Sequence, residues 1–192
     1  MPKQTPKITK MINSQFIFIV GFMASGKSTF GKRAAKELGC QFIDTDVFIA
    51  EKEKKSIPEI FSLYGEKYFR LLEKYALNDI IKMTGNFVIS TGGGMSCNQP
   101  RLNKMLKNGK VIYLKIDEKS VVNRLKAAKV KRPLVANLSE EGLRKTVSDL
   151  LKKRKKYYSQ AHLVVKSLEA KKFDFGEMRL AFNKNEIKNN DN

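Results

Sequence analysis

The residues with the clearest chemical signature form a glycine-rich segment near the N-terminal end of the chain. Residues 21–28 read Gly-Phe-Met-Ala-Ser-Gly-Lys-Ser, which fits the phosphate-binding pattern G-x-x-x-x-G-K-[ST] at every fixed position. In this pattern backbone N–H groups and a helix N-terminus cradle phosphate oxygens, while Lys27 can reach the outer phosphates and Ser28 can offer a hydroxyl to Mg²⁺. The segment therefore predicts nucleoside-triphosphate binding. A plain glycine turn would not explain a lysine and a serine together at the helix start.

Strands and helices alternate along the chain around this loop. The apolar run 16–20 before the loop is typical of a buried strand, and the helical segment 29–38 after it ends at Gly39. Further strands are predicted over 41–43, 86–90, 110–116 and 163–166, and further helices over 47–54, 56–65, 66–83, 99–107, 118–128 and 139–158. Alternation of this kind predicts an α/β fold with a parallel sheet covered on both faces. Ligands then bind beyond the carboxyl ends of the strands.

Two aspartates follow the second predicted strand, in the sequence Asp44-Thr45-Asp46. In an extended chain two side chains two residues apart point the same way. One carboxylate could then hold Mg²⁺ through water while the other faces an acceptor hydroxyl. The alternative is a helix N-cap, which explains one aspartate more easily than two.

Two more motifs could bind a small substrate. The triple glycine Gly92-Gly93-Gly94 follows the third predicted strand, where it would let the backbone approach a ligand closely, although a flexible loop would also use glycine. Arg70 and Glu73 lie three residues apart on a predicted helix and can pair. An arginine held by a glutamate suits recognition of a substrate carboxylate, whereas a solvated surface pair is the simpler interpretation.

Composition limits the remaining possibilities. With 192 residues, the chain is expected to hold one domain, flanked by a basic, disordered leader (1–14) and a low-complexity tail (184–192). Its formal net charge of +19 favours either a nucleic-acid partner or a lysine-rich solvated surface, and the spread of lysines without interleaved aromatic residues favours the latter. The two cysteines have no metal-binding spacing.

The ordered set of motifs resembles the shikimate kinase family. The set comprises Gly21–Thr29, Asp44-Thr45-Asp46, Phe69-Arg70 with Glu73, Gly92–Gly94, Arg132-Pro133-Leu134 and Arg154 with Tyr158. The resemblance implies a P-loop kinase related to nucleoside monophosphate kinases. Its expected fold is a three-layer α/β/α domain over residues 15–183 with a five-stranded parallel central sheet and a mobile lid at about 129–138.

The resemblance also implies a reaction and the residues that perform it. The γ-phosphoryl group of ATP would pass to the 3-hydroxyl of shikimate in aromatic amino-acid biosynthesis, with Mg²⁺ as cofactor. The expected catalytic residues are Lys27, Asp46 and Arg132. The expected ATP-binding residues are Ala24, Ser25, Gly26, Lys27, Ser28, Thr29, Arg124 and Arg132, and the metal ligands are Ser28 and Asp44. The expected substrate-binding residues are Asp46, Arg70, Glu73, Gly92, Gly93, Gly94 and Arg154. A monomeric, cytoplasmic protein that binds neither nucleic acid nor membrane is expected.

Some positions depart from the family pattern, and other functions stay open. The usual proline between Arg154 and Tyr158 is missing, and His162 stands where a small residue is common and is given no role. A gluconate or nucleoside-monophosphate kinase would share the loop but should lack the two aspartates combined with a late triple glycine. A basic nucleic-acid-binding or regulatory nucleotide-binding protein would need neither Asp46 nor Arg70. A non-catalytic homologue is disfavoured because Lys27 and the other key residues are intact.

Overall fold

The computed structural model describes residues 16–128, 135 and 138–176. The expected leader and tail lie outside the described residues, as does most of the expected lid, including Arg132. No helix within the described part is long and apolar enough to cross a membrane.

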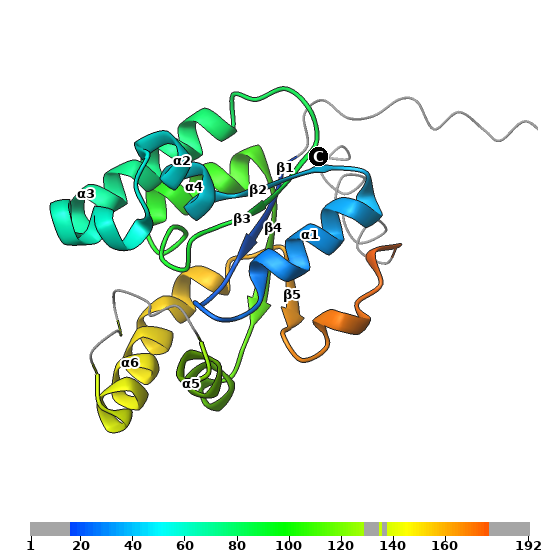
Figure 1. Cartoon of the computed structure of the whole chain (residues 1–192). Helices are drawn as coiled ribbons and strands as arrows, with labels where there is room; N and C mark the ends of the chain where they lie inside the picture. Colours follow the sequence, from blue (N-terminus) through cyan, green and yellow to red (C-terminus); the bar gives the residue numbers. More distant parts are fainter. Residues whose placement is uncertain (1–15, 129–134, 136–137, 177–192) are drawn as a thin grey trace, which may run out of the picture.

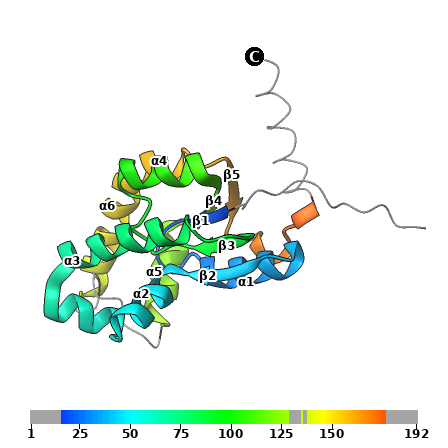
Figure 2. The ribbon, with the colours of Figure 1, turned by 90° about the horizontal axis from the view of Figure 1, so that it is seen from above.

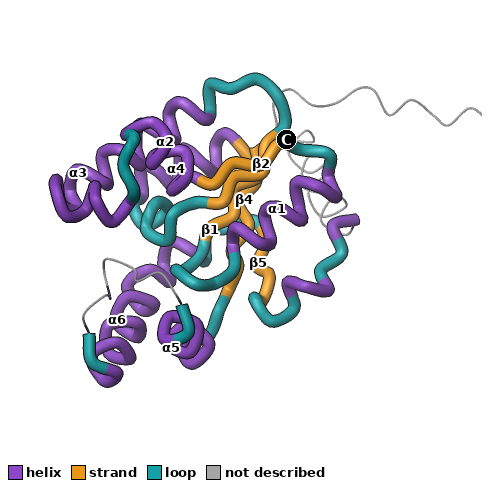
Figure 3. Tube along the Cα trace, in the orientation of Figure 1, coloured by secondary structure: helices purple, strands orange, loops and turns teal. Residues whose placement is uncertain are grey.

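Five strands form one all-parallel sheet in the order β2-β3-β1-β4-β5, which confirms the predicted fold class. Figure 3 shows the strands in orange with helices around them. The strands are β1 (Phe16–Val20), β2 (Gln41–Asp44), β3 (Phe87–Ser90), β4 (Gly109–Lys115) and β5 (Leu163–Lys166). Every residue of β1 is buried, as expected for a central strand covered on both faces. Because β1 pairs with β3 on one side and β4 on the other, the loops after these strands meet at one edge.

Helices cover both faces of the sheet (Figures 1 and 2). Strand β1 contributes alternate residues to each face. Ile17 and Ile19 pack with Phe30 of α1 (Lys27–Leu38). Phe16 and Phe18 belong to the cluster on the opposite face, which is formed with α3 (Ile57–Ile80), α4 (Gln99–Asn108) and α6 (Glu140–Tyr158). This period-two division follows from strand geometry and produces the three-layer architecture.

Smaller helices complete the body around the site. Helix α2 (Thr45–Glu53) packs on α3, where Ile49, Ile60 and Phe69 share a hydrophobic cluster. Helix α5 (Glu118–Lys126) packs on α6, and a 3₁₀ turn, η2 (Ala170–Lys172), follows β5. The predicted capping box at Ser56 and the predicted interruption at Gly65, whose φ is 76° and ψ is 177°, are both present in α3.

One prediction about the aspartates is wrong. Helix α2 begins at Thr45 rather than Val47, so Asp46 lies in its first turn and does not share an extended segment with Asp44. The cause is capping, because the Asp44 carboxylate accepts a hydrogen bond from the backbone N–H of Asp46 at 3.0 Å. The remaining boundary differences are shifts of one to three residues, such as the end of α3 at Ile80 instead of Met83.

The close contact between β1 and β4 leads to a prediction about stability. Gly109 pairs with Phe16, and a Cβ on Gly109 would lie 2.1 Å from the Phe16 carbonyl oxygen. We expect Gly109→Ala to lower the free energy of unfolding by about 1–3 kcal/mol, because the central strands must shift apart. Urea denaturation measures this loss. The control is Gly142→Ala in α6, where a Cβ would meet only side chains and the change should stay below about 1 kcal/mol. Equal losses would contradict the argument.

Candidate active site

The phosphate-binding loop joins β1 to α1, as the sequence predicts. Gly26 caps α1 with a φ of 95°, and Ala24 also has a positive φ, of 60°. The Lys27 side chain is buried, and its Nζ donates to the Phe22 carbonyl oxygen at 2.8 Å. Ser28 and Thr29 are exposed in the first turn of α1. The loop therefore presents a helix N-terminus, a cation and a hydroxyl on one short segment, which suits phosphate binding.

Two other parts of the chain hold this loop in place. Ser167, just after β5, donates from Oγ to the Ser25 carbonyl oxygen at 2.7 Å. Arg124 on α5 donates from Nη1 to the Ala24 carbonyl oxygen and to Ser167 Oγ, both at 3.0 Å. The predicted nucleotide-contacting Arg124 is thus adjacent to the loop, whereas the contribution of Ser167 was not predicted.

The two expected metal ligands are in contact. Ser28 Oγ donates to Asp44 Oδ2 at 2.6 Å, and Ser90 Oγ lies 3.3 Å from Ser28 Oγ. Hydroxyl and carboxylate oxygens are hard ligands of the kind that Mg²⁺ prefers. No group of three or more histidine, cysteine, aspartate or glutamate residues suited to a metal occurs in the described residues. The residues present thus fit a Mg²⁺ ion that takes most of its ligands from water and phosphate.

A pocket opens beside the phosphate-binding loop. Its lining residues are Met23, Asp46, Ile57, Phe61, Phe69, Arg70, Glu73, Gly92, Gly93, Gly94 and Arg154. All seven residues that the sequence analysis assigned to substrate binding are among them. The other four are apolar, so the pocket combines an apolar wall with a few convergent polar groups, as small-molecule sites do.

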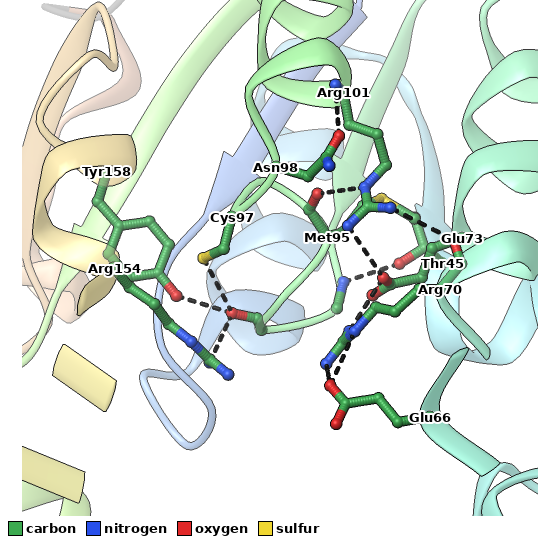
Figure 4. Close-up of polar contacts among 12 residues, drawn as sticks. Thr45, Glu66, Arg70, Glu73, Met95, Cys97, Asn98, Arg101, Arg154 and Tyr158 are labelled. Atoms are coloured by element: carbon green, nitrogen blue, oxygen red, sulfur yellow. Dashed lines mark hydrogen bonds and ion pairs between the residues drawn. The ribbon is translucent and has the colours of Figure 1, made fainter. Parts of the chain in front are cut away.

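Arg70 is held between two carboxylates on its own helix (Figure 4). Its Nη1 donates to Glu73 Oε2 at 2.9 Å, as predicted, and its Nε and Nη2 donate to Glu66 Oε1 at 3.1 and 2.6 Å. These bonds use one N–H on each nitrogen and leave a second N–H on both terminal nitrogens for a ligand carboxylate. Glu73 is completely buried, and its burial raises the pKa of its carboxyl group, an effect that the positive charge of Arg70 opposes.

The three glycines leave room for these functional groups. A Cβ on Gly92 would lie 2.7 Å from Asp46 Oδ1, and a Cβ on Gly94 would lie 2.7 Å from Arg70 Nη1. Gly92 and Gly94 therefore pack closely against Asp46 and Arg70, and a Cβ at either position would displace one of these side chains.

The Gly93 carbonyl oxygen fixes Arg154. It accepts a hydrogen bond from Arg154 Nη1 at 2.9 Å and from the Tyr158 hydroxyl at 2.7 Å (Figure 4). Arg154 is buried, with its guanidinium 5.1 Å from the centroid of the Phe22 ring, whereas Lys153 and Lys155 beside it are exposed. The structure thus singles out Arg154 as the inward-pointing cation of the lysine-rich run.

Some contacts around the pocket were not predicted from the sequence. Arg101 on α4 contacts Glu73, but a lone charged residue on a predicted helix is usually solvated. Glu66 also contacts Arg70, and the i,i+4 spacing of this pair could have predicted the contact. His162, which was given no role, accepts a hydrogen bond at Nδ1 from the backbone N–H of Val111 over 2.9 Å, and partial desolvation lowers the pKa of its imidazole. This hydrogen bond joins the residue before β5 to the backbone of β4, and His162 does not line the pocket.

The fold and the site together define a P-loop kinase of small molecules. The sequence profile of a family described as shikimate kinase matches residues 23–179. The chain belongs to the shikimate kinase family.

Individual relatives agree with this assignment. The chain is 41% identical to the shikimate kinase of Azobacteroides pseudotrichonymphae over 148 residues, which cover 77% of this chain and 87% of the relative. The crystal structure of shikimate kinase from Bacteroides thetaiotaomicron superposes with a TM-score of 0.75 and 35% identity, covering 80% of this chain and 86% of that one. Shikimate kinase from Acinetobacter baumannii, solved in complex with shikimate, gives a TM-score of 0.72 and 33% identity, covering 79% and 83%.

The hydrogen bonds to Gly93 lead to a prediction. We expect Tyr158→Phe to lower the free energy of unfolding by about 0.5–1.5 kcal/mol, because a buried donor to the loop is lost while the ring still fills its place. Chemical denaturation measures the change. The control is Tyr113→Phe, since the Tyr113 ring stacks on Tyr158 with centroids 4.9 Å apart but its hydroxyl bonds to none of the described residues. An equal or larger loss for the control would show that the change does not come from the hydrogen bond to Gly93.

Proposed function

We propose that the pocket beside the phosphate-binding loop binds shikimate and that its 3-hydroxyl is phosphorylated there by ATP bound on the loop. The observation that carries this proposal is that all seven expected substrate-binding residues line one pocket next to the loop. The family assignment and the relative from Acinetobacter baumannii, which was solved with shikimate, support it.

The phosphate side of the site supplies charge and orientation. Backbone N–H groups of the loop and the N-terminus of α1 would hold the phosphates, and Lys27 would neutralise the charge that develops during transfer. Ser28 directly and Asp44 through water would hold Mg²⁺, which when bound neutralises phosphate charge. Arg124 would contact the adenine base. Arg132 and the lid at about 129–138, most of which lies outside the described residues, would complete the site and exclude water.

The acceptor side supplies a base and a carboxylate clamp. Asp46 lines the pocket and would orient the 3-hydroxyl and accept its proton. Arg70 and Arg154 would bind the carboxylate of shikimate, because a guanidinium donates in a planar fork that matches a carboxylate. Glu73 would hold the Arg70 guanidinium in place. The triple glycine would leave room for Arg70 and offer backbone groups to the ring hydroxyls. A single kinase domain over 15–183, a monomeric state and a cytoplasmic location remain predictions.

Shikimate must be distinguished from other acceptors by experiment. A gluconokinase from Sinorhizobium meliloti superposes with a TM-score of 0.52 at 14% identity, which shows a shared fold alone. Release of ADP should be measured in a coupled assay with Mg-ATP and shikimate, gluconate, AMP or no acceptor. Turnover with shikimate only is expected. Turnover with another acceptor would contradict the assignment of shikimate as the substrate. The assignment of the phosphate-binding loop would still hold.

The proposed base leads to a prediction about turnover. We expect Asp46→Asn to lower kcat at least about 10²-fold, because the amide cannot accept the proton of the 3-hydroxyl. Steady-state kinetics with shikimate and ATP measure the change. The control is Asp79→Asn, since Asp79 lies on the same helix pair but forms an exposed ion pair with Lys52. An unchanged kcat for Asp46→Asn would give the carboxylate a structural role as a neighbour of the Asp44 cap.

The proposed carboxylate clamp leads to a prediction about affinity. We expect Arg70→Lys to raise the KM for shikimate about tenfold or more with little change in the KM for ATP, because an ammonium cannot donate two parallel hydrogen bonds. Gly94→Ala should act in the same direction by displacing the guanidinium. The control is Arg144→Lys, because Arg144 forms a similar i,i+4 pair with Glu140 on the exposed face of α6. Equal effects on both substrates would overturn the assignment of Arg70.

A further inference from the structure

Arg101 is a largely buried arginine at the edge of the site to which neither the sequence motifs nor the proposed function gives a role. It lies in the first turn of α4, and its backbone N–H is capped by the Asn98 side chain at 3.2 Å. Its side chain is only 13% exposed and points toward α3 instead of toward solvent (Figure 4). A long cationic side chain is rarely buried without partners, so its contacts call for an explanation.

Three contacts connect Arg101 with the segments that carry the substrate-binding residues. Its Nε donates to the Met95 carbonyl oxygen at 2.8 Å, in the turn directly after the triple glycine. Its Nη1 donates to the backbone carbonyl oxygen of Arg70 at 3.3 Å. Its Nη2 lies 3.7 Å from Glu73 Oε2. One guanidinium therefore spans the glycine turn, the backbone of the clamp arginine and the carboxylate that holds that arginine.

The electrostatics of Glu73 explain why a second cation is needed there. Glu73 is completely buried, and its Oε1 has no hydrogen-bond partner among the described residues. Burial raises the pKa of this carboxyl group, the cations Arg70 and Arg101 lower it, and the nearby carboxylate of Asp46 raises it. When a substrate carboxylate binds to Arg70, the Arg70 guanidinium stabilises the ionised form of Glu73 less. Arg101 is the other cation close to Glu73 and can keep its carboxylate ionised.

We propose that Arg101 is a positioning residue for substrate binding: it holds Glu73 and the Arg70 backbone so that the Arg70 guanidinium faces the pocket. This inference rests on the proposed function, because it concerns the affinity for the carboxylate-bearing substrate. The competing explanation is a purely structural role, in which Arg101 joins α4 to α3 and affects only stability.

The chain offers a matched control for this distinction. Lys104 lies one turn further along α4 and also joins α4 to α3, with its Nζ 2.6 Å from Asn78 Oδ1, but it touches none of the pocket residues. Arg101→Met and Lys104→Met thus each remove one cation between the same two helices, and both keep an unbranched apolar side chain.

The first test compares kinetic constants. We expect Arg101→Met to raise the KM for shikimate about tenfold or more, the effect of losing hydrogen bonds to a charged group, with kcat and the KM for ATP changed less than about threefold. Lys104→Met should leave all three constants near those of the unmodified chain. An unchanged KM for shikimate in Arg101→Met, or equal losses in both KM values and kcat, would overturn the proposal. Absence of shikimate turnover in the unmodified chain would instead overturn the proposed function.

The second test asks whether Arg101 acts through Glu73. In a double-mutant cycle, Glu73→Gln should remove most of the further effect of Arg101→Met on the KM for shikimate, because no charge is then left to balance. Additive effects would contradict the proposal.

The fall in kcat/KM for shikimate at low pH should also move to higher pH in Arg101→Met, but not in Lys104→Met. If Arg101→Met does not fold, Arg101→Lys can replace it, because lysine keeps the cation but not the three contacts. Arg101→Lys should show a smaller rise in the KM for shikimate. No rise in that variant would overturn the proposal as well.

Discussion

The position of β1 between β3 and β4 in an all-parallel sheet is the constraint on which the rest of this molecule depends. Parallel pairing places the carboxyl ends of the strands at one edge, so the phosphate-binding loop after β1 meets the aspartates after β2 and the glycines after β3. Both faces of β1 are packed, which fixes its register. A slip of one residue would move Phe16 and Phe18 to the face where Ile17 and Ile19 now pack. The site therefore inherits its geometry from the core, and its loops need little stability of their own.

Within that frame the substrate side is organised around buried charge. A completely buried carboxylate such as Glu73 is costly unless cations compensate it, and the structure supplies Arg70 and Arg101. Arg154 is buried in a comparable way, but a backbone carbonyl and an aromatic ring hold it in place of a carboxylate. Two arginines prepared by different partners thus face one pocket, and neither has to lose much side-chain entropy when a ligand binds.

The sequence predicts the frame well because the frame rests on local signals. Apolar runs, the capping box at Ser56 and the glycine at the end of α1 identify the elements, and their alternation predicts the parallel sheet. The aspartate prediction failed because capping by Asp44 pulled Asp46 into a helix, a competition between two local patterns that spacing does not decide. Arg101 and Ser167 could not be predicted, since each acts through a partner distant in the sequence whose position depends on the packed fold. Glu66 lies four residues before Arg70 on the same helix, so its contact could have been predicted from the spacing.

The high positive charge of the chain and the arginines at the pocket contribute differently to ligand binding. A net charge of +19 attracts any anion at long range, including both expected substrates, and this attraction is screened by salt and selects nothing by itself. Selection requires cations whose direction is fixed, and the arginines at the pocket are the ones held by carboxylates, carbonyl oxygens or an aromatic ring. The exposed Lys152 and Lys153 line a groove beside the pocket, and no hydrogen bond or ion pair with the described residues fixes their direction. Long-range attraction and short-range recognition are thus carried by different residues of the same helix, since Arg154 directly follows these two lysines and points inward.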